Sequence, residues 1–355
     1  MGGVLDEMTG GKEKNRFFME IASGIVVSML IVFITIYMPL MGFFMATILP
    51  MPILYFRLKL GRNLGALIMF AVFVMTFAAT YNFSGMNGGL SEITSNSLPK
   101  AGGLSLSIDI LFYGSLLLTG FFLGEFLELR LSIEKSFVYT LISTLGISAA
   151  AFFVYAASTG QGVLSIVSGY VADNLQLTLA LYDNMGMSPE NIQLISDSIH
   201  AIQYILVRII PALVTILLSF VIWVNILFIK KILDKKAIHL TELQNLNQWK
   251  AQEHLVWVVI ALGLLMVIPG KGIKIVAFNC IMILMIMYFF QGIAILAFIF
   301  ERKKLPILLK IAIYSIIAIQ QILILAIIGL GFFDTWVNFR KIGINNKPDE
   351  QSFDG

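Results

Sequence analysis

Long apolar runs alternate with short polar segments along almost the whole chain. About 20 mostly apolar residues cross a bilayer as a helix, so each uncharged run of that length predicts a transmembrane helix. We count nine, with eight or ten as alternatives, because the second and the seventh are short. The runs are Phe17–Tyr37, Met41–Phe56, Asn63–Tyr81, Leu106–Phe126, Phe137–Ser158, Ile202–Ile229, Leu255–Ile268, Ile273–Phe300 and Leu305–Gly331. The pattern predicts an all-α, polytopic helical bundle.

Composition supports a membrane protein and excludes several other classes. The chain is 58% hydrophobic and 13% charged, whereas soluble domains are roughly 45–50% apolar and about 25% charged. The single cysteine, Cys280, rules out an internal disulfide framework and a cysteine-based zinc site. The net charge of +3 comes from short loops, so nothing supports nucleic-acid binding. The expected surroundings are the lipid bilayer.

Basic residues predict the orientation, because cytoplasmic loops carry the excess of Lys and Arg. Alternation of nine spans puts the N-terminus and five basic segments in the cytoplasm. These segments contain Lys12–Arg16, Arg57–Arg62, Arg130–Lys135, Lys230–Lys250 and Arg302–Lys304. The C-terminal tail does not fit this rule, because nine crossings place the basic residue Arg340 outside the cytoplasm. Either one span is miscounted or the last segment bends back.

The outward segments differ from each other. Residues 82–104, which begin at Asn82, are rich in Gly, Ser and Asn and predict a flexible loop. Residues 159–200 predict an amphipathic helical hairpin, whose second arm restarts at Ser188 and Pro189 and continues into the sixth span. We divide the chain into a cytoplasmic tail (1–16), a five-helix half (17–158), the hairpin (159–200), C-terminal membrane helices (201–333) including a cytoplasmic surface helix (230–252), and a polar tail (334–355).

Polar groups at membrane depth are the candidates for a binding site, because an ionisable side chain there costs at least about 2.5–3.5 kcal/mol. Asp109 and Arg208 lie at similar predicted depth, so they form either a neutralising ion pair or a substrate site together with Asn82 and Gln320. The doublet Gln320–Gln321 predicts at least one amide in the bundle interior. Glu20 and Glu125 are expected to snorkel to water, and Asn225 and Gln291 to hydrogen-bond across helices.

The stretch "LPMPILYFRLKLGRNLGALI", residues 49–68, interrupts an apolar run with prolines and then with Arg57, Lys59 and Arg62 around Gly61. We interpret the charges as a topology anchor, with Gly61 making the turn. A docking site for a cytoplasmic partner is the alternative. Gly120 and Gly124 form a GxxxG pair, which allows close helix packing within the bundle or against another subunit.

Catalytic signatures are missing from the sequence. It contains no HExxH, no glycine-rich phosphate loop and no GxSxG, and its three histidines are scattered. We therefore expect no enzymatic activity, no ATPase, no cofactor and no metal site.

Two short motifs carry a resemblance to a family. The proline-containing run that leads into the basic turn, and the ending "GLGFFDTWVNFRK" with Asp334, Trp336, Phe339 and Arg340, resemble the YybS-like family of bacterial membrane proteins. The first six spans are more distantly similar to the S components of energy-coupling-factor transporters. This resemblance implies the cytoplasmic (inner) membrane of a bacterium, an outward-opening small-molecule pocket and a coupling partner with two ATPases.

Two functions follow as expectations. The first is a small-molecule-binding transport subunit without its own ATPase. The second is a non-catalytic structural or assembly subunit that binds other membrane subunits or a cytoplasmic coupling protein through the hairpin and the cytoplasmic helix.

Overall fold

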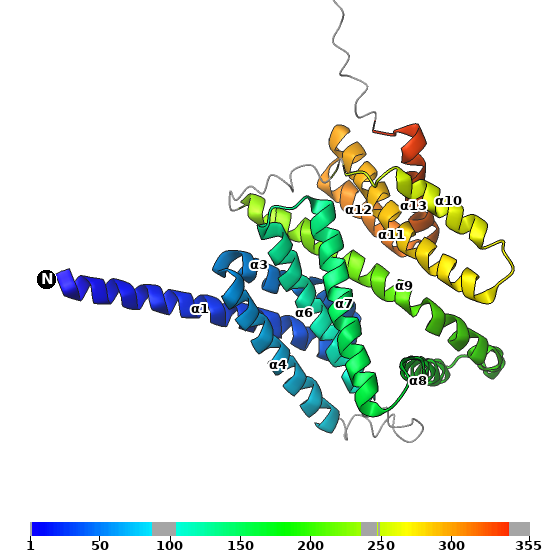
Figure 1. Ribbon diagram of the computed structural model, residues 1–355, viewed down its shortest axis with the longest axis horizontal. Coiled ribbons are helices and arrows are strands. Elements are labelled where there is room, and N and C mark those ends of the chain that lie inside the picture. The colour runs from blue at the N-terminus through cyan, green and yellow to red at the C-terminus, as the bar shows by residue number, and fades with distance from the viewer. Residues whose placement is uncertain (1, 87–103, 236–246, 248, 341–355) are drawn as a thin grey trace, which may run out of the picture. The chain divides into compact units, whose positions relative to one another are not determined.

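The computed structural model describes residues 2–86, 104–235, 247 and 249–340, and these residues form helices and connecting turns without a strand. The chain divides into two compact units, Met1–Glu242 and Leu243–Gly355, each with its own packing (Figure 1). The prediction of an all-α helical bundle is confirmed. Of the predicted loop 82–104, residues 87–103 lie outside the described residues, whereas residues 82–86 are helical. Of the predicted surface helix 230–252, residues 230–235 are the end of a long helix, residues 236–246 and 248 lie outside the described residues, and residues 249–252 are not helical.

The first unit contains eight described helices. They are α1 (Gly2–Tyr37), α2 (Pro39–Ile48), α3 (Pro50–Leu60), α4 (Arg62–Met86), α6 (Leu104–Glu128), α7 (Ile133–Thr159), α8 (Val163–Asn184) and α9 (Pro189–Lys235). Helix α1 begins at Gly2, so the segment that we predicted as a tail continues the first span as a helix.

Helices α2 and α3 together form one predicted span, Met41–Leu60, with a break at Leu49. Each of the two helices begins with a proline, which suits the first helical position because its missing N–H would have no intrahelical partner there. Leu49 and Ile53 are fully buried in the apolar core of the first unit, with Ile68 of α4 and Leu116 of α6. The prolines therefore shape a central element of the bundle.

Helix α9 is the longest element, with 47 residues. At 1.5 Å per residue it is about 70 Å long, more than twice the roughly 30 Å of hydrocarbon in a bilayer, so part of it extends beyond the membrane. Figure 1 shows α8 nearly end-on, whereas α7 and α9 run along the plane of the view. Helix α8 thus lies across the long helices beside it.

The second unit contains α10 (His254–Leu265), α11 (Lys271–Arg302), α12 (Ile307–Ile319) and α13 (Gln321–Val337). Helix α10 has 12 residues and rises about 18 Å, which is too short for a full crossing. In the described chain, seven helices are long and apolar enough to span a membrane, or eight if the bent pair α12–α13 counts as one. The predicted seventh span is the element that falls short.

The bend between α12 and α13 is 106° and lies at Gln320. Beyond it, Arg340 donates hydrogen bonds to the carbonyl oxygens of Asn247 (3.3 Å) and Trp249 (2.9 Å), and the amide of Asn247 also bonds Glu301 near the end of α11. The end of α13 therefore lies on the same side as the end of α11. Of the two alternatives for the tail, the structure favours a last segment that bends back. Because α13 extends to Val337, the boundary that we placed at residue 333 falls inside a helix.

Candidate functional site

Three features of the described chain are candidate functional sites, because each contains buried polar groups or a cavity. They are a cluster of ion pairs at one end of the first unit, an apolar pocket at its other end, and a buried hydrogen-bond network in the second unit. Glu20 of the cluster and Thr35 of the pocket lie on the same helix, α1, and the rise between them is about 22 Å.

The ion-pair cluster is built around Arg57, whose side chain is only 1% exposed. Its guanidinium lies 2.5 Å from a carboxylate oxygen of Glu125 and 2.5 Å from one of Glu128, both on α6. Two glycines make room for the side chain. A Cβ atom at Gly124 would lie 2.6 Å from Arg57 Cγ, and one at Gly65 would lie 2.9 Å from Arg57 Cα. Larger residues at either glycine would displace the arginine.

The other basic residues of the opening motif surround this pair. Lys59 Nζ lies 2.8 Å from Glu20 of α1, and Arg62 Nε lies 3.7 Å from Glu125. Gly61 adopts φ +88°, a conformation that favours glycine, and so makes the turn from α3 to α4 as predicted. Glu20 and Glu125, which we expected to snorkel to water, instead pair with the basic turn.

The predicted GxxxG pair packs against the proline-containing helix. A Cβ atom at Gly120 would collide with the backbone carbonyl of Pro50, and Gly124, one turn further along α6, faces Arg57, which lies about two turns further along α3. The glycines thus form a contact inside the unit. The sequence alone gave no partner for Glu125 and Glu128, although their position within four residues after Gly124 was a usable signal.

The cluster contains three cations (Arg57, Lys59, Arg62) and three carboxylates (Glu20, Glu125, Glu128), so its formal charges cancel. A site of this kind holds helices together and does not present a net positive charge to an anionic ligand. Arg62 and Glu128 remain largely exposed and form the polar rim of the cluster. The arrangement fits a structural joint between helices with an exposed polar rim.

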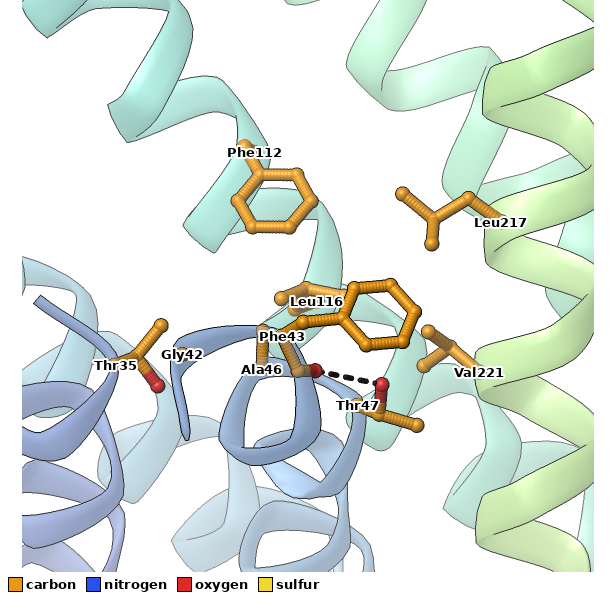
Figure 2. A pocket seen from close by; sticks show the side chains of 9 residues that line it. All are labelled: Thr35, Gly42, Phe43, Ala46, Thr47, Phe112, Leu116, Leu217 and Val221. Carbon is orange, nitrogen blue, oxygen red and sulfur yellow. Dashed lines mark hydrogen bonds between the residues drawn. The ribbon is translucent and has the colours of Figure 1, made fainter. Parts of the chain in front are cut away.

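The pocket lies between α1, α2, α6 and α9 and has a volume of about 270 Å³. Figure 2 shows its side chains, contributed by four helices around a common space. The lining residues are Thr35, Gly42, Phe43, Ala46, Thr47, Phe112, Leu116, Leu217 and Val221. The two hydroxyls donate to their own helices, Thr35 to Ile31 and Thr47 to Phe43. The pocket therefore has an apolar wall.

Asn225 of α9 hydrogen-bonds to two residues that line the pocket. It is fully buried, and its side-chain amide donates to the carbonyl oxygens of Thr47 and Val221, each at 2.8 Å. One of these bonds joins α9 to α2, as the prediction of interhelical bonding required. Because Thr47 and Val221 both line the pocket, this bond fixes the distance between two of its walls.

The predicted substrate residues lie elsewhere. Asp109 is exposed at the start of α6, and Arg208 donates to the Tyr204 carbonyl at 2.9 Å and stacks on the Tyr204 ring. Burial and, second, the charge of Asp109 raise the pKa of Tyr170 on α8. The side chain of Asn82 is outside the described part. Neither Asp109 nor Arg208 lines the pocket, and the role of the four residues as a substrate site stays a prediction.

Gln320 belongs to the second unit, where both it and Gln321 are exposed. The expectation that one amide of this doublet lies in the bundle interior is wrong within this unit, because the doublet sits at the bend and not on a buried helix face. Gln291 of α11 takes the interior position instead and is fully buried.

The network of the second unit joins the C-terminal motif to Gln291. Arg340 Nη2 lies 2.9 Å from Asp334 Oδ2, and both side chains are 1% exposed. The Gln291 amide donates to the same oxygen at 3.0 Å, while the Gln291 carbonyl oxygen accepts from the Ala251 N–H at 3.2 Å. The Phe339 N–H donates to the other oxygen of Asp334. Asp334 and Arg340 are therefore a structural pair in which each charge has several partners.

No group of three or more metal-ligating side chains is found among the described residues. No curated protein and no solved structure matches the chain. Residues 102–335 match the family described as "Predicted membrane protein (DUF2232)". This region contains α6 to α12 and nearly all of α13, and so includes Glu125 of the cluster, the α6 and α9 walls of the pocket, and Asp334. Because the match covers more than half of the 355 residues, the protein is a membrane protein that belongs to the DUF2232 family.

Proposed function

We propose that the protein is the small-molecule-binding subunit of a bacterial membrane transporter and that the apolar pocket of the first unit is its binding site. The observation that carries this proposal is a partly open space of approximately 270 Å³ that is lined by four helices. The distant similarity of the first six spans to transporter S components supports the same function. In the predicted orientation the pocket lies toward the outer side, because it adjoins the turn between α1 and α2.

The lining determines the chemical class of the ligand. Seven of the nine lining residues have no side-chain hydrogen-bonding group, and both threonine hydroxyls already donate to backbone carbonyls. A charged or strongly polar group would lose its hydration there without replacement. A cavity of about 150 Å³ holds benzene, and drug-sized ligands need roughly 300 Å³ or more. The ligand is therefore a small, neutral and mainly apolar molecule.

Active transport by this protein would need a partner subunit that supplies the energy. Its sequence contains no phosphate-binding loop, so ATP hydrolysis would come from a separate coupling subunit on the cytoplasmic side. The rim of the ion-pair cluster, with Arg62 and Glu128 exposed, is the surface that we assign to this contact. Its mixed charges suit a polar and reversible interface.

The test is native mass spectrometry of the full-length protein released from detergent. A co-purified small molecule is expected on the wild type and is expected to be lost in Val221→Phe, which fills the pocket from α9. Val26→Phe on α1 is the matched control, because Val26 is exposed and does not line the pocket. A wild type that carries no small molecule, or equal retention in both variants, would contradict the assignment.

A structural or assembly subunit is the second candidate function. It is favoured by α8, which lies outside the predicted spans and exposes Leu177, Leu181 and Met185. Replacing these three residues with serine should cause the complex of this protein with other membrane subunits to dissociate on native gels, while the pocket still binds its ligand. An unchanged complex would remove the support for this alternative.

A further inference from the structure

The pocket of the first unit has an open end and a closed end. Three of its helices, α2, α6 and α9, each contain a pair of lining residues four positions apart, which is a rise of about 6 Å. In each pair the first residue is more exposed than the second. The pairs are Phe43 and Thr47, Phe112 and Leu116, and Leu217 and Val221. Figure 2 shows Phe112 and Leu217 at the top of the view, above Leu116 and Val221. The first residue of each pair therefore lies at the open end.

Asp109 lies beyond this open end, on the face of α6 that lines the pocket. Asp109, Phe112 and Leu116 have the spacing i, i+3 and i+7, and residues with this spacing share one face of a helix. Asp109 precedes Phe112 by three residues, so it is displaced by about 4.5 Å along the helix axis, in the direction of the open end. The side chain of Asp109 is exposed. The pocket-lining face of α6 thus ends in a carboxylate.

This carboxylate is the only charge close to the pocket in the sequence of the four lining helices. Within four positions of each of the nine lining residues, the sequence contains no other Asp, Glu, Lys or Arg. Among the described residues, Asp109 forms neither an ion pair nor a side-chain hydrogen bond. It lies at the start of a candidate membrane span, Ile108–Glu128, and ionisable residues in such spans are rare and often functional. Asp109 is therefore available to a ligand that enters the pocket.

The two ends of the pocket select the two ends of a ligand. The closed end has apolar walls and accepts a hydrocarbon group. The open end has a carboxylate next to it, and an ionised carboxylate only accepts hydrogen bonds. A hydroxyl group on the outer end of the ligand can donate to this carboxylate, and hydrogen bonds to an ionised group are about twice as strong as those between neutral groups. The hydroxyl group carries no charge, so the ligand as a whole stays neutral.

We propose that Asp109 determines the specificity of the pocket and that the ligand is a small aliphatic alcohol. Its hydrocarbon body lies between α2, α6 and α9, and its hydroxyl group donates a hydrogen bond to the Asp109 carboxylate at the open end. This inference rests on the proposed function, because it specifies the ligand of the same pocket.

The test compares two photoreactive probes on the full-length protein in liposomes. The probes are diazirine derivatives of octanol and of octane, which differ only in the hydroxyl group and are used at equal concentration in the membrane. After irradiation, mass spectrometry measures the adducts on Leu217 and Val221. The octanol probe should label the wild type about tenfold more than the octane probe, as expected for a hydrogen bond to a charged group.

Substitutions of Asp109 test whether the carboxylate causes this difference. Asp109→Leu should lower labelling by the octanol probe to the level of the octane probe, and labelling by the octane probe should not change. Asp109→Asn keeps an acceptor oxygen and should retain part of the difference. Asp183→Leu is the matched control, because Asp183 is also exposed but lies on α8, which does not line the pocket. Size-exclusion profiles confirm that the variants stay folded.

The outcomes separate the role of Asp109 from the pocket itself. Equal labelling by the two probes, unchanged labelling by the octanol probe in Asp109→Leu, or stronger labelling by the matched octylamine probe would overturn the alcohol assignment. The pocket would still stand in these cases if Val221→Phe blocks the probes. If neither probe labels the lining residues of the wild type, or if Val221→Phe changes nothing, both the pocket and the role of Asp109 are contradicted.

Discussion

The two units each contain a buried arginine. The difference between the surroundings of these arginines indicates how much stability each unit loses when a carboxylate partner is removed. Arg57 and Arg340 both have side chains that are 1% exposed, and in both the Nε atom has no hydrogen-bond acceptor within the described chain. Arg57 faces two carboxylates, Glu125 at 20% and Glu128 at 56% exposure. Arg340 faces a single carboxylate, Asp334, that is as buried as itself.

The Arg57 cluster therefore has two carboxylates that water can reach, whereas the Arg340 pair has one carboxylate that is shielded from water. Removing one carboxylate from the Arg57 cluster leaves another, and water reaches both. Among the described residues, removing Asp334 leaves a charged guanidinium whose remaining hydrogen-bond partners are the carbonyls of Asn247 and Trp249. Breaking a buried pair from one side costs far more than breaking an exposed one. The comparison can be tested by three substitutions.

The largest effect is expected from Asp334→Leu. It leaves Arg340 buried without a counter-charge and removes the acceptor for Gln291 and Phe339, so it should destabilise the second unit by about 3–5 kcal/mol. The measurement is thermal unfolding in detergent, combined with proteolysis in the segment around Trp249.

The double variant Asp334→Leu and Arg340→Met serves as the control for this substitution. It removes both charges and should recover most of the loss, because a buried pair can be replaced by apolar groups at little cost. Failure of the double variant to recover stability would show that the hydrogen bonds of Asp334 matter more than its charge.

A smaller effect is expected from Gly120→Ala in the first unit. The added Cβ would collide with the backbone carbonyl of Pro50, which cannot rotate away, so α3 and α6 must separate and the unit should lose about 1–3 kcal/mol. Gly146→Ala on α7 is the matched control, because nothing lies within 4 Å of its Cβ position.

Replacing a glycine inside a helix by alanine otherwise gains up to about 1 kcal/mol. Gly146→Ala should therefore raise the unfolding temperature, while Gly120→Ala lowers it. If both variants shift in the same direction, the contact between Gly120 and Pro50 does not limit the packing of the first unit.

Much of the fold could be predicted from the sequence, because the thickness of the bilayer sets the number of apolar residues in a transmembrane helix. The first run, Phe17–Tyr37, coincides with a candidate span, and the short second run extends to Leu60. The seventh run was misjudged because its helix ends at Leu265, after which tight turns lead to Gly270. Run length does not distinguish a short membrane helix from a full crossing.

The pairing of the helices could not be predicted. In a membrane, apolar side chains face both lipid and protein, so hydrophobic periodicity does not indicate which faces meet. Gly124 and Arg57 were both recognised as unusual, yet nothing in the spacing brought them together. The pocket was missed for the same reason, because an alanine or a leucine beside empty space has no sequence signature. The position of the end of α13 beside the end of α11 could be recognised only from the contacts of Arg340 with Asn247 and Trp249.

The smallest effect is expected from Glu128→Gln. This carboxylate is 56% exposed and Glu125 stays beside Arg57, so the unit should lose no more than about 1 kcal/mol. Thermal unfolding at low and high salt provides the measurement, since salt screens an exposed pair and should reduce the difference between wild type and variant. Glu125→Gln is the matched control and should cost more, because Glu125 is less exposed and also approaches Arg62. Equal losses in the two variants would mean that exposure does not distinguish the two carboxylates, and a loss in either variant as large as that of Asp334→Leu would contradict their redundancy.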